Sequence, residues 1–287
     1  MKYKNLYKFR VMNTNALACL ANCNLWFSKL DDLNDPFEGI YDIDTLVDNM
    51  TRQELFDLAH KILSISRPAE NVDQRTDYLI GLYLAKGQMS FEVAAKKFVK
   101  EMVRKTMTEM RKHSGVLSLS SDKPTEDHKF DLMESNVANL HMWSLYSDGL
   151  RGFALHFDGE ELTRSITELN DSKFAFNPVN YDIKAASPKL AVDKSEIIDS
   201  SSLFQALNTK HEIFSNEVEF RVLSKSFGLK KYSPESLKHV FIGERMPSGQ
   251  VELLKLIVNS KYKNTKMLRV VTIKNSFHIE LKELEED

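Results

Sequence analysis

The chain has 287 residues and a mass of 33.0 kDa, enough for one large domain or two smaller ones. Hydrophobic residues make up 42% of it, aromatic residues 10% and charged residues 28%, which excludes an intrinsically disordered protein. The 39 basic and 41 acidic residues give a net charge of −2. This balance disfavours a general nucleic-acid-coating role, because such proteins are strongly basic, but it allows a local basic groove.

Two cysteines, Cys19 and Cys23, cannot form a disulfide framework, and they lie four residues apart in a helical pattern. We interpret them as reduced, largely buried thiols, because two further metal ligands are not evident nearby. The amino-terminal residues lack the pattern of a signal peptide, and no run reaches the ~18 apolar residues of a membrane span. The sequence therefore predicts a cytoplasmic protein without a membrane partner.

The first third of the chain predicts a strand, a helix and a second strand, followed by a loop and a long helical segment. Their ranges are 3–10, 13–22, 25–28, 33–39 and 45–113. Asn13 can cap the first helix, and Thr51 with Glu54 forms a capping-box signature. Residues 45–113 carry almost no strand signal, so we expect a helical insertion there.

The remainder alternates strands with short helices. Residues 116–120 alternate apolar and hydroxyl side chains, as a half-buried strand does. The other expected strands are 152–157, 180–183, 218–223, 238–242 and a closing hairpin of 267–273 with 278–284, and the expected helices are 139–147, 203–214 and 248–258. This order predicts a single α+β domain over residues 1–287 that carries the 45–113 insertion.

Paired glutamates are the strongest chemical signal. On a strand, Glu217, Glu219 and Arg221 project from one face, which places two carboxylates about 7 Å apart. One interpretation is a solvated face on which Arg221 screens the carboxylates. The other is a site for a positively charged substrate or transition state, as in glycosyl transfer through an oxocarbenium-like state.

Hydroxyl and guanidinium groups provide two further candidates. Ser118 and Ser120 project from one face of a strand and can hold a ribose or a carboxamide, although serine-rich edge strands are common. Arg10 ends the first strand and can bind a pyrophosphate through two hydrogen bonds, or serve as a salt-bridge partner.

A loop and a short helix complete the candidates. Asn34 and Asp35 lie in a rigid, acid-bearing loop that also suits an Asx turn. Trp143 and Tyr146 share a helix face, which is typical of a core and also suits stacking on a base or nicotinamide. The sequence has no P-loop, Rossmann or nucleophile-elbow motif, and its eight histidines show no metal-binding spacing.

Several of these segments together resemble a bacterial family of unknown function, domain-of-unknown-function family twenty-nine seventy-one. The segments are Leu6–Arg10, Leu25–Ser28, Asn34–Glu38, Met142–Tyr146 with Asp148, Gly152 and Phe157-Asp158, Glu217–Arg221, and Ile242-Gly243. Phe214 stands where that family is expected to carry a tryptophan before the glutamates.

The order of Arg10, the Ser118/Ser120 strand and the Glu217/Glu219 strand is also similar to the ADP-ribosyltransferase superfamily. This resemblance implies a mixed, mainly antiparallel split sheet, and NAD as a substrate with no metal. ADP-ribose would be transferred to an unknown acceptor macromolecule, and the superfamily's habits suggest a toxin or phage-defence role.

The transferase resemblance also implies a role for each residue. Arg10 would hold the pyrophosphate, Ser118 or Ser120 the nicotinamide ribose, and Trp143 or Tyr146 a ring, with Ser28 competing for the serine role. Glu219 would stabilise positive charge as nicotinamide leaves, and Glu217 would orient or deprotonate the acceptor. Asn34 and Asp35 complete the expected cofactor-binding set.

Two alternatives belong to other classes. The first is a non-catalytic binding or sensing module, with its glutamates paired to Arg221 and Arg245 and the 45–113 insertion as partner surface. A cleft joining Arg10, Glu219 and a serine favours the enzyme, whereas Arg10 and Glu219 on opposite faces favour the module. The second is nucleic-acid binding by a basic stripe on the insertion, comprising Lys96, Lys97, Lys100, Arg104, Lys105, Arg111 and Lys112, which also suits a solvated helix face.

Overall fold

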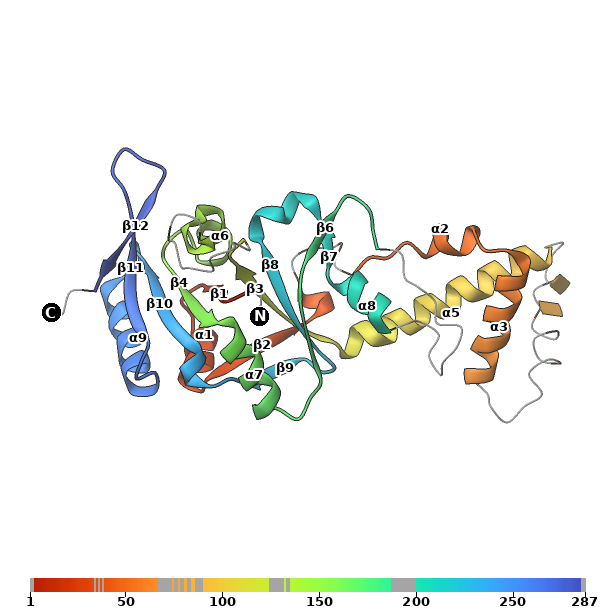
Figure 1. Cartoon of the computed structure of the whole chain (residues 1–287), viewed down its shortest axis with the longest axis horizontal. Coiled ribbons are helices and arrows are strands. Elements are labelled where there is room, and N and C mark those ends of the chain that lie inside the picture. Colours follow the sequence, from red (N-terminus) through yellow and green to blue (C-terminus); the bar gives the residue numbers. More distant parts are fainter. Residues whose placement is uncertain are drawn as a thin grey trace. The chain divides into compact units, whose positions relative to one another are not determined.

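The chain folds into two compact units, as seen in a computed structural model (Figure 1). Unit 1 comprises Met1–Lys29, Ser114–Val179 and Ile213–Asp287, and unit 2 comprises Leu30–His113 and Asn180–Glu212. The predicted insertion at 45–113 lies within unit 2. The structure describes residues 3–33, 35, 37, 39–66, 74, 77, 80–81, 84–85, 90–123, 132, 135–186 and 200–284.

A mixed, largely antiparallel sheet forms the body of unit 1. Its strands are β1 (Asn5–Arg10), β2 (Asn24–Lys29), β3 (Gly115–Ser121), β4 (Phe153–Asp158), β5 (Phe174–Pro178), β8 (Glu219–Ser224), β9 (Gly228–Lys231), β10 (Leu237–Gly243), β11 (Lys266–Thr272) and β12 (Ile279–Glu283). The main path runs β12-β11-β10-β4-β1-β3-β2-β9, while β8 pairs with β3 and β5 with β8. Every pairing in this sheet is antiparallel except β10 with β11. The α+β class predicted from the sequence is thus confirmed.

The sheet divides along one edge of β3. The carboxyl end of β3 pairs with β1, where Tyr7 faces Ser120, and its amino end pairs with β2, where Lys29 faces Gly115. In the gap between the two partners, the ammonium of Lys8 donates to the carbonyl of Ser118 at 2.6 Å. Lys8 therefore satisfies a strand carbonyl that has no neighbouring strand at that point.

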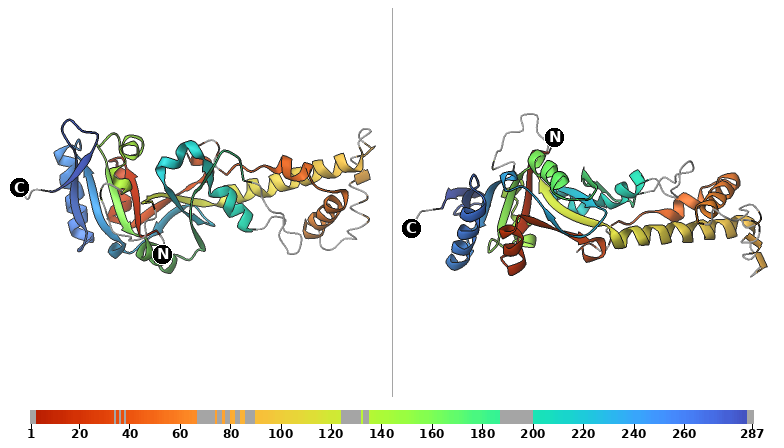
Figure 2. Two further views of the ribbon diagram at one scale, coloured as in Figure 1. Left: turned by 45° about the horizontal axis from the view of Figure 1, so that its top comes forward. Right: turned by 90° about the horizontal axis from the view of Figure 1, so that it is seen from below.

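Helices cover both faces of the sheet of unit 1. They are α1 (Thr14–Ala21), α6 (Leu140–Tyr146), α7 (Gly159–Leu169) and α9 (Ser248–Lys261), with short 3₁₀ turns η2 (Asn136–Ala138), η3 (Glu212–Glu217) and η4 (Pro234–Ser236). α1 packs against α9, and Figure 2 shows α9 beside the strands of its end of the sheet from two further directions. Alternation along β1 assigns its residues to two separate cores: Leu6 joins the core beneath α1, α7 and α9, and Tyr7 joins the core beneath α6.

Unit 2 is mainly helical. Its elements are η1 (Leu30–Asp32), α2 (Ile43–Asp48), α3 (Arg52–Ser66), α5 (Phe91–His113), α8 (Ser200–Leu207) and the parallel strand pair β6 (Asn180–Asp182) with β7 (Thr209–His211). α5 packs against both α2 and α3. The predicted capping box is present, because the Glu54 carboxylate accepts from the backbone N–H of Thr51 at 2.7 Å and Thr51 Oγ1 accepts from the N–H of Glu54.

The expected helix over 203–214 is wrong in its second half. α8 ends at Leu207, and Asn208 terminates it by donating from its backbone N–H and its side-chain amide to the carbonyl of Phe204. The chain then enters β7, which pairs with β6. Sequence analysis also missed α7, β5 and β9, although Asp158 caps α7 through the backbone N–H of Glu161 at 3.0 Å.

Candidate ligand-binding pocket beside Arg10

A cavity of about 420 Å³ opens in unit 1 where β1 ends, α1 runs and β2 begins. Its size is that of a small-molecule site. Its lining includes polar side chains of α1 and its flanks, together with Trp26 of β2 and Leu229 of β9. Arg10, the last residue of β1, contributes the charge.

The Arg10 guanidinium is half-buried at this pocket. Among the described residues it has no carboxylate partner within ion-pair distance and no side-chain hydrogen bond. Burial lowers the pKa of this group, while the neighbouring Cys19 and Tyr232 act in the opposite direction. Arginine stays protonated in proteins, so the pocket holds a positive charge that a ligand anion can complete.

Local sequence explains how α1 forms the pocket wall. Asn13 caps the helix, because its Oδ1 accepts from the backbone N–H of Ala16 at 2.8 Å. Ala16 and Leu20 project into the core. Asn15, Ala18, Cys19 and Asn22 recur at three- and four-residue spacing, so they share another face, and all four line the pocket.

Four asparagines contribute amide groups to the pocket, namely Asn13, Asn15, Asn22 and Asn24. Asn13 uses its oxygen in the cap, and Asn22 donates its amide to the carbonyl of Ala18 at 2.8 Å. The side chains of Asn15 and Asn24 make no hydrogen bond to other described residues. The pocket therefore offers donors and acceptors as well as a cation.

Cys19 lies on the wall of this pocket, and both cysteines are free and half-buried. In the described part of the chain, no group of three or more His, Cys, Asp or Glu side chains is arranged to hold a metal ion.

The paired glutamates are separated by a backbone turn. Val218 adopts a positive φ of 45°, and β8 begins only at Glu219, so Glu217 lies outside the strand. The Glu217 carboxylate accepts from the hydroxyl of Tyr146 at 2.8 Å. The expected row of three side chains on one strand face is therefore wrong for Glu217.

Glu219 is buried rather than solvated. Arg221, which is fully buried, donates from Nε to Glu219 Oε1 at 2.7 Å and from Nη2 to Oε2 at 3.1 Å. This is the bidentate geometry of a strong ion pair. The expectation of a solvated face is wrong, because both partners are held within the protein.

Glu219 does not line the pocket beside Arg10. Glu219 faces Ser120 across β8 and β3, and Ser120 faces Tyr7 across β3 and β1, so these three project from one face. Arg10 lies three residues beyond Tyr7, past the last residue pair of β1 with β3. The predicted arginine and glutamate therefore do not share the pocket described here.

The two serines lie on the Glu219 side of the sheet. Ser120 is buried, donates to the backbone carbonyl of Glu217 and accepts a hydrogen bond from the Asn136 amide. Ser118 is half-buried in β3, opposite Arg221. Neither serine lines the pocket beside Arg10.

Trp143 is a core residue. It is fully buried, donates from Nε1 to the carbonyl of Val137 at 2.8 Å and meets Phe9 edge-on. Its full burial agrees with the core interpretation of this helix face and leaves no face of the indole for a ligand ring to stack on. Tyr146 is half-buried and bound to Glu217.

The remaining predicted residues lie elsewhere. Ser28 is half-buried in β2 opposite Val116. Asn34 lies outside the described residues. Asp35 is buried and forms the Asx turn considered from the sequence, since its Oδ1 accepts from the N–H of Phe37 at 2.9 Å.

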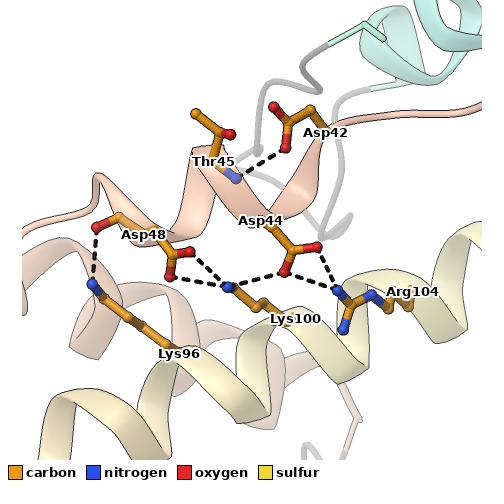
Figure 3. A network of polar contacts seen from close by, with 7 residues as sticks. All are labelled: Asp42, Asp44, Thr45, Asp48, Lys96, Lys100 and Arg104. Carbon is orange, nitrogen blue, oxygen red and sulfur yellow. Dashed lines mark hydrogen bonds and ion pairs between the residues drawn. The ribbon is translucent and has the colours of Figure 1, made fainter.

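Part of the basic stripe on α5 contacts α2 within unit 2 (Figure 3). Lys100 lies 2.9 Å from a carboxylate oxygen of Asp48 and 3.0 Å from one of Asp44, while Arg104 contacts Asp44 at 2.8 Å. Lys96 donates to the backbone carbonyl of Asp48. Hydrogen bonds from Lys100 and then Arg104 lower the pKa of Asp44. These contacts favour the solvated-face interpretation over nucleic-acid binding.

Trp26 and the asparagines are the pocket residues that sequence analysis missed. The sequence places Trp26 only in an apolar strand, although alternation between buried Leu25 and Phe27 already indicates that it projects from the other face. Four asparagines within residues 13–24 are an unusual polar density around a short helix. No described helix has the length and apolar character needed to cross a bilayer.

Neither the curated proteins nor the solved structures contain a significant match to the chain. Two of the family signatures noted in the sequence, Met142–Tyr146 and Glu217–Arg221, fall within one matched region, which begins within α6 and ends within β8. That region is residues 142–222, and the family model it matches is described as protein of unknown function (DUF2971).

Proposed function

We propose that unit 1 is a ligand-binding module that takes a small phosphate-bearing molecule in the pocket beside Arg10. The observation that carries this proposal is a half-buried guanidinium, without a protein partner among the described residues, in a cavity of about 420 Å³. A partly desolvated cation is stabilised by an anion, and guanidinium groups match phosphate geometry through paired hydrogen bonds. NAD, expected from the transferase resemblance, is one member of this ligand class.

The transferase alternative is less well supported. It requires Glu219 to reach the ribose of a dinucleotide whose pyrophosphate is held by Arg10, but Glu219 does not line the pocket beside Arg10. Glu219 is also held in a bidentate pair by Arg221. The pairing of Glu219 with Arg221, and its absence from the lining of the pocket, favour a binding or sensing module, the second class considered from the sequence.

Isothermal titration tests the binding proposal. We expect ribose 5-phosphate to bind the wild-type chain at low salt, and Arg10→Gln to weaken binding by roughly 10- to 100-fold, the value of a charge-assisted hydrogen-bonded contact. Arg164→Gln is the matched control, because it removes the same charge from an exposed position on α7. Equal affinities of wild type and Arg10→Gln, or no binding by wild type, would reject the proposal.

An assay of nicotinamide release tests the transferase alternative with the same proteins. Release from NAD by wild type that disappears in both Arg10→Gln and Glu219→Gln, with both variants folded, would favour the enzyme over the module. We expect no release above the uncatalysed rate.

A further inference from the structure

The lining of the pocket includes an exposed aromatic ring. Trp26 is 44% exposed, and Leu229, which faces it directly across β2 and β9, is 54% exposed. Cross-strand partners project from the same face, so the indole and the leucine form one apolar surface. The indole N–H has no hydrogen-bond partner among the described residues. A large, partly exposed ring in the lining of a pocket is suited to stacking against a flat ligand.

Asn24 adds a hydrogen-bonding group beside this surface. It lies two residues before Trp26 on β2, so the two side chains project from the same face of the strand. Both line the pocket, and the Asn24 amide makes no hydrogen bond to the described residues. An asparagine amide pairs one donor and one acceptor, which matches the edge of a nucleobase.

We infer that the ligand is a nucleotide, with its phosphate at Arg10, its base stacked on Trp26 and its base edge bound by Asn24. This inference rests on the proposed function and adds the ring-binding part of the site. The three groups are the ones a nucleotide requires, and all of them line one cavity of about 420 Å³. A sugar phosphate would use Arg10 and leave the apolar surface of Trp26 and Leu229 uncovered.

Comparison of three ligands distinguishes a nucleotide site from a site that binds only a sugar phosphate. Titration of AMP, ribose 5-phosphate and inorganic phosphate into the full-length chain measures how much the base contributes. Stacking of one base on an aromatic side chain corresponds to roughly 5- to 150-fold in affinity, so AMP should bind more tightly than ribose 5-phosphate by a factor in that range.

Trp26→Ala should remove this preference while leaving ribose 5-phosphate binding nearly unchanged. Because Trp26 is outside the buried core, the variant is expected to fold, which thermal unfolding followed by circular dichroism checks. Leu253→Ala is the matched control, since Leu253 is an exposed apolar residue on α9 and does not line the pocket.

Each outcome has a definite meaning. AMP preference that is lost only in Trp26→Ala supports the nucleotide site. Equal affinities for AMP and ribose 5-phosphate, or a preference that survives Trp26→Ala, reject the base site and leave the phosphate-binding proposal intact. Failure of all three ligands to bind rejects both.

The role of Asn24 has its own test. Asn24→Ala should change the relative affinities for AMP, GMP, CMP and UMP by at least several-fold, because the amide distinguishes base edges. Unchanged relative affinities would remove Asn24 from base recognition.

Discussion

At the scale of single residues, His156 lies in a buried polar chain within unit 1. Its ring stacks between Tyr7 and His239, with centroid distances of 4.9 and 5.1 Å. Its Nε2 meets the Asn5 side-chain oxygen at 3.0 Å, and its Nδ1 meets His239 Nδ1 at 2.9 Å. The Asn5 amide donates to Asp122, so its oxygen accepts from Nε2 of His156, while one proton is shared between the two Nδ1 atoms of His156 and His239. Burial favours the neutral form of His156.

We therefore expect acid to destabilise the fold through His156. Burial, followed by the charge of His239, lowers its folded pKa to about 3, whereas an unfolded histidine has a pKa near 6.5. Between these values the unfolded state binds the proton, so the free energy of unfolding falls as pH decreases, by at most about 1.4 kcal/mol per pH unit. Urea unfolding from pH 7 to pH 4 measures this slope.

His156→Gln should show a smaller slope than the wild type, even if it is less stable at pH 7. His113→Gln, at the exposed end of α5, should keep the wild-type slope. A slope that does not change in His156→Gln would show that other groups produce the acid sensitivity.

The buried pair of Glu219 and Arg221 makes a second residue-scale prediction. Glu219→Gln removes the charge that compensates a fully buried guanidinium, which typically costs about 3–5 kcal/mol of stability. Glu109→Gln, in an exposed pair with Lys112 on α5, should leave the free energy of unfolding nearly unchanged. If both substitutions have the same small effect in urea unfolding, the ion pair is not a structural element of the sheet.

At the scale of elements, the amino-terminal cap of α1 links fold stability to the pocket. Asn13→Ala removes the acceptor for the N–H of Ala16 and should lower the free energy of unfolding by about 1 kcal/mol. Asn13→Ser, which keeps a capping oxygen, should recover most of the loss. Identical stability of the alanine and serine variants in urea would mean that capping does not determine the stability of this helix.

The elements with a regular local pattern could be predicted from the sequence. The alternating serines of β3 and the Asn13 cap of α1 locate these two elements to within about two residues. β5 and β9 were missed because short strands become strands only through pairing, here with β8 and β2. The end of α8 was missed because the β6–β7 pairing is a tertiary contact that the local pattern does not contain.

The candidate site could be predicted only in part, because it too depends on tertiary contacts. The sequence identifies Arg10 as a possible anion ligand, since it is a positively charged residue at the end of a strand. Which side chains surround Arg10 depends on where β1 leaves β3 and where β2 joins it, which a sequence pattern does not determine. Trp26 joins Arg10 in the pocket only because β2 returns beside the end of β1 after α1.

At the scale of the whole molecule, unit 1 is built from three separate stretches of chain and unit 2 from two. Lys29 and Gly115, which lie on either side of the first stretch of unit 2, are direct partners in the pairing of β2 with β3. Two residues suffice to connect antiparallel partners.

We therefore expect unit 1 to keep its fold when residues 30–114 are replaced by Asn-Gly. Cooperative thermal unfolding and the near-ultraviolet circular dichroism of the buried Trp143 should both persist. A second shortened protein that also carries Leu207→Ser controls for aggregation, because Leu207 is buried within unit 2 and would become exposed. Loss of the cooperative transition in both would mean that the sheet of unit 1 depends on unit 2.

The two strands on the divided edge of β3, β1 and β2, are expected to lose their pairing with it separately during local unfolding. Among the described strands, β3 pairs with β1 and with β2 through only two residue pairs each. On one side, β1 pairs with β4, which pairs with β10; on the other, β2 pairs with β9. Amide protons on the two sides are therefore expected to exchange with deuterium as two cooperative groups, with the slower group on the side that includes β4.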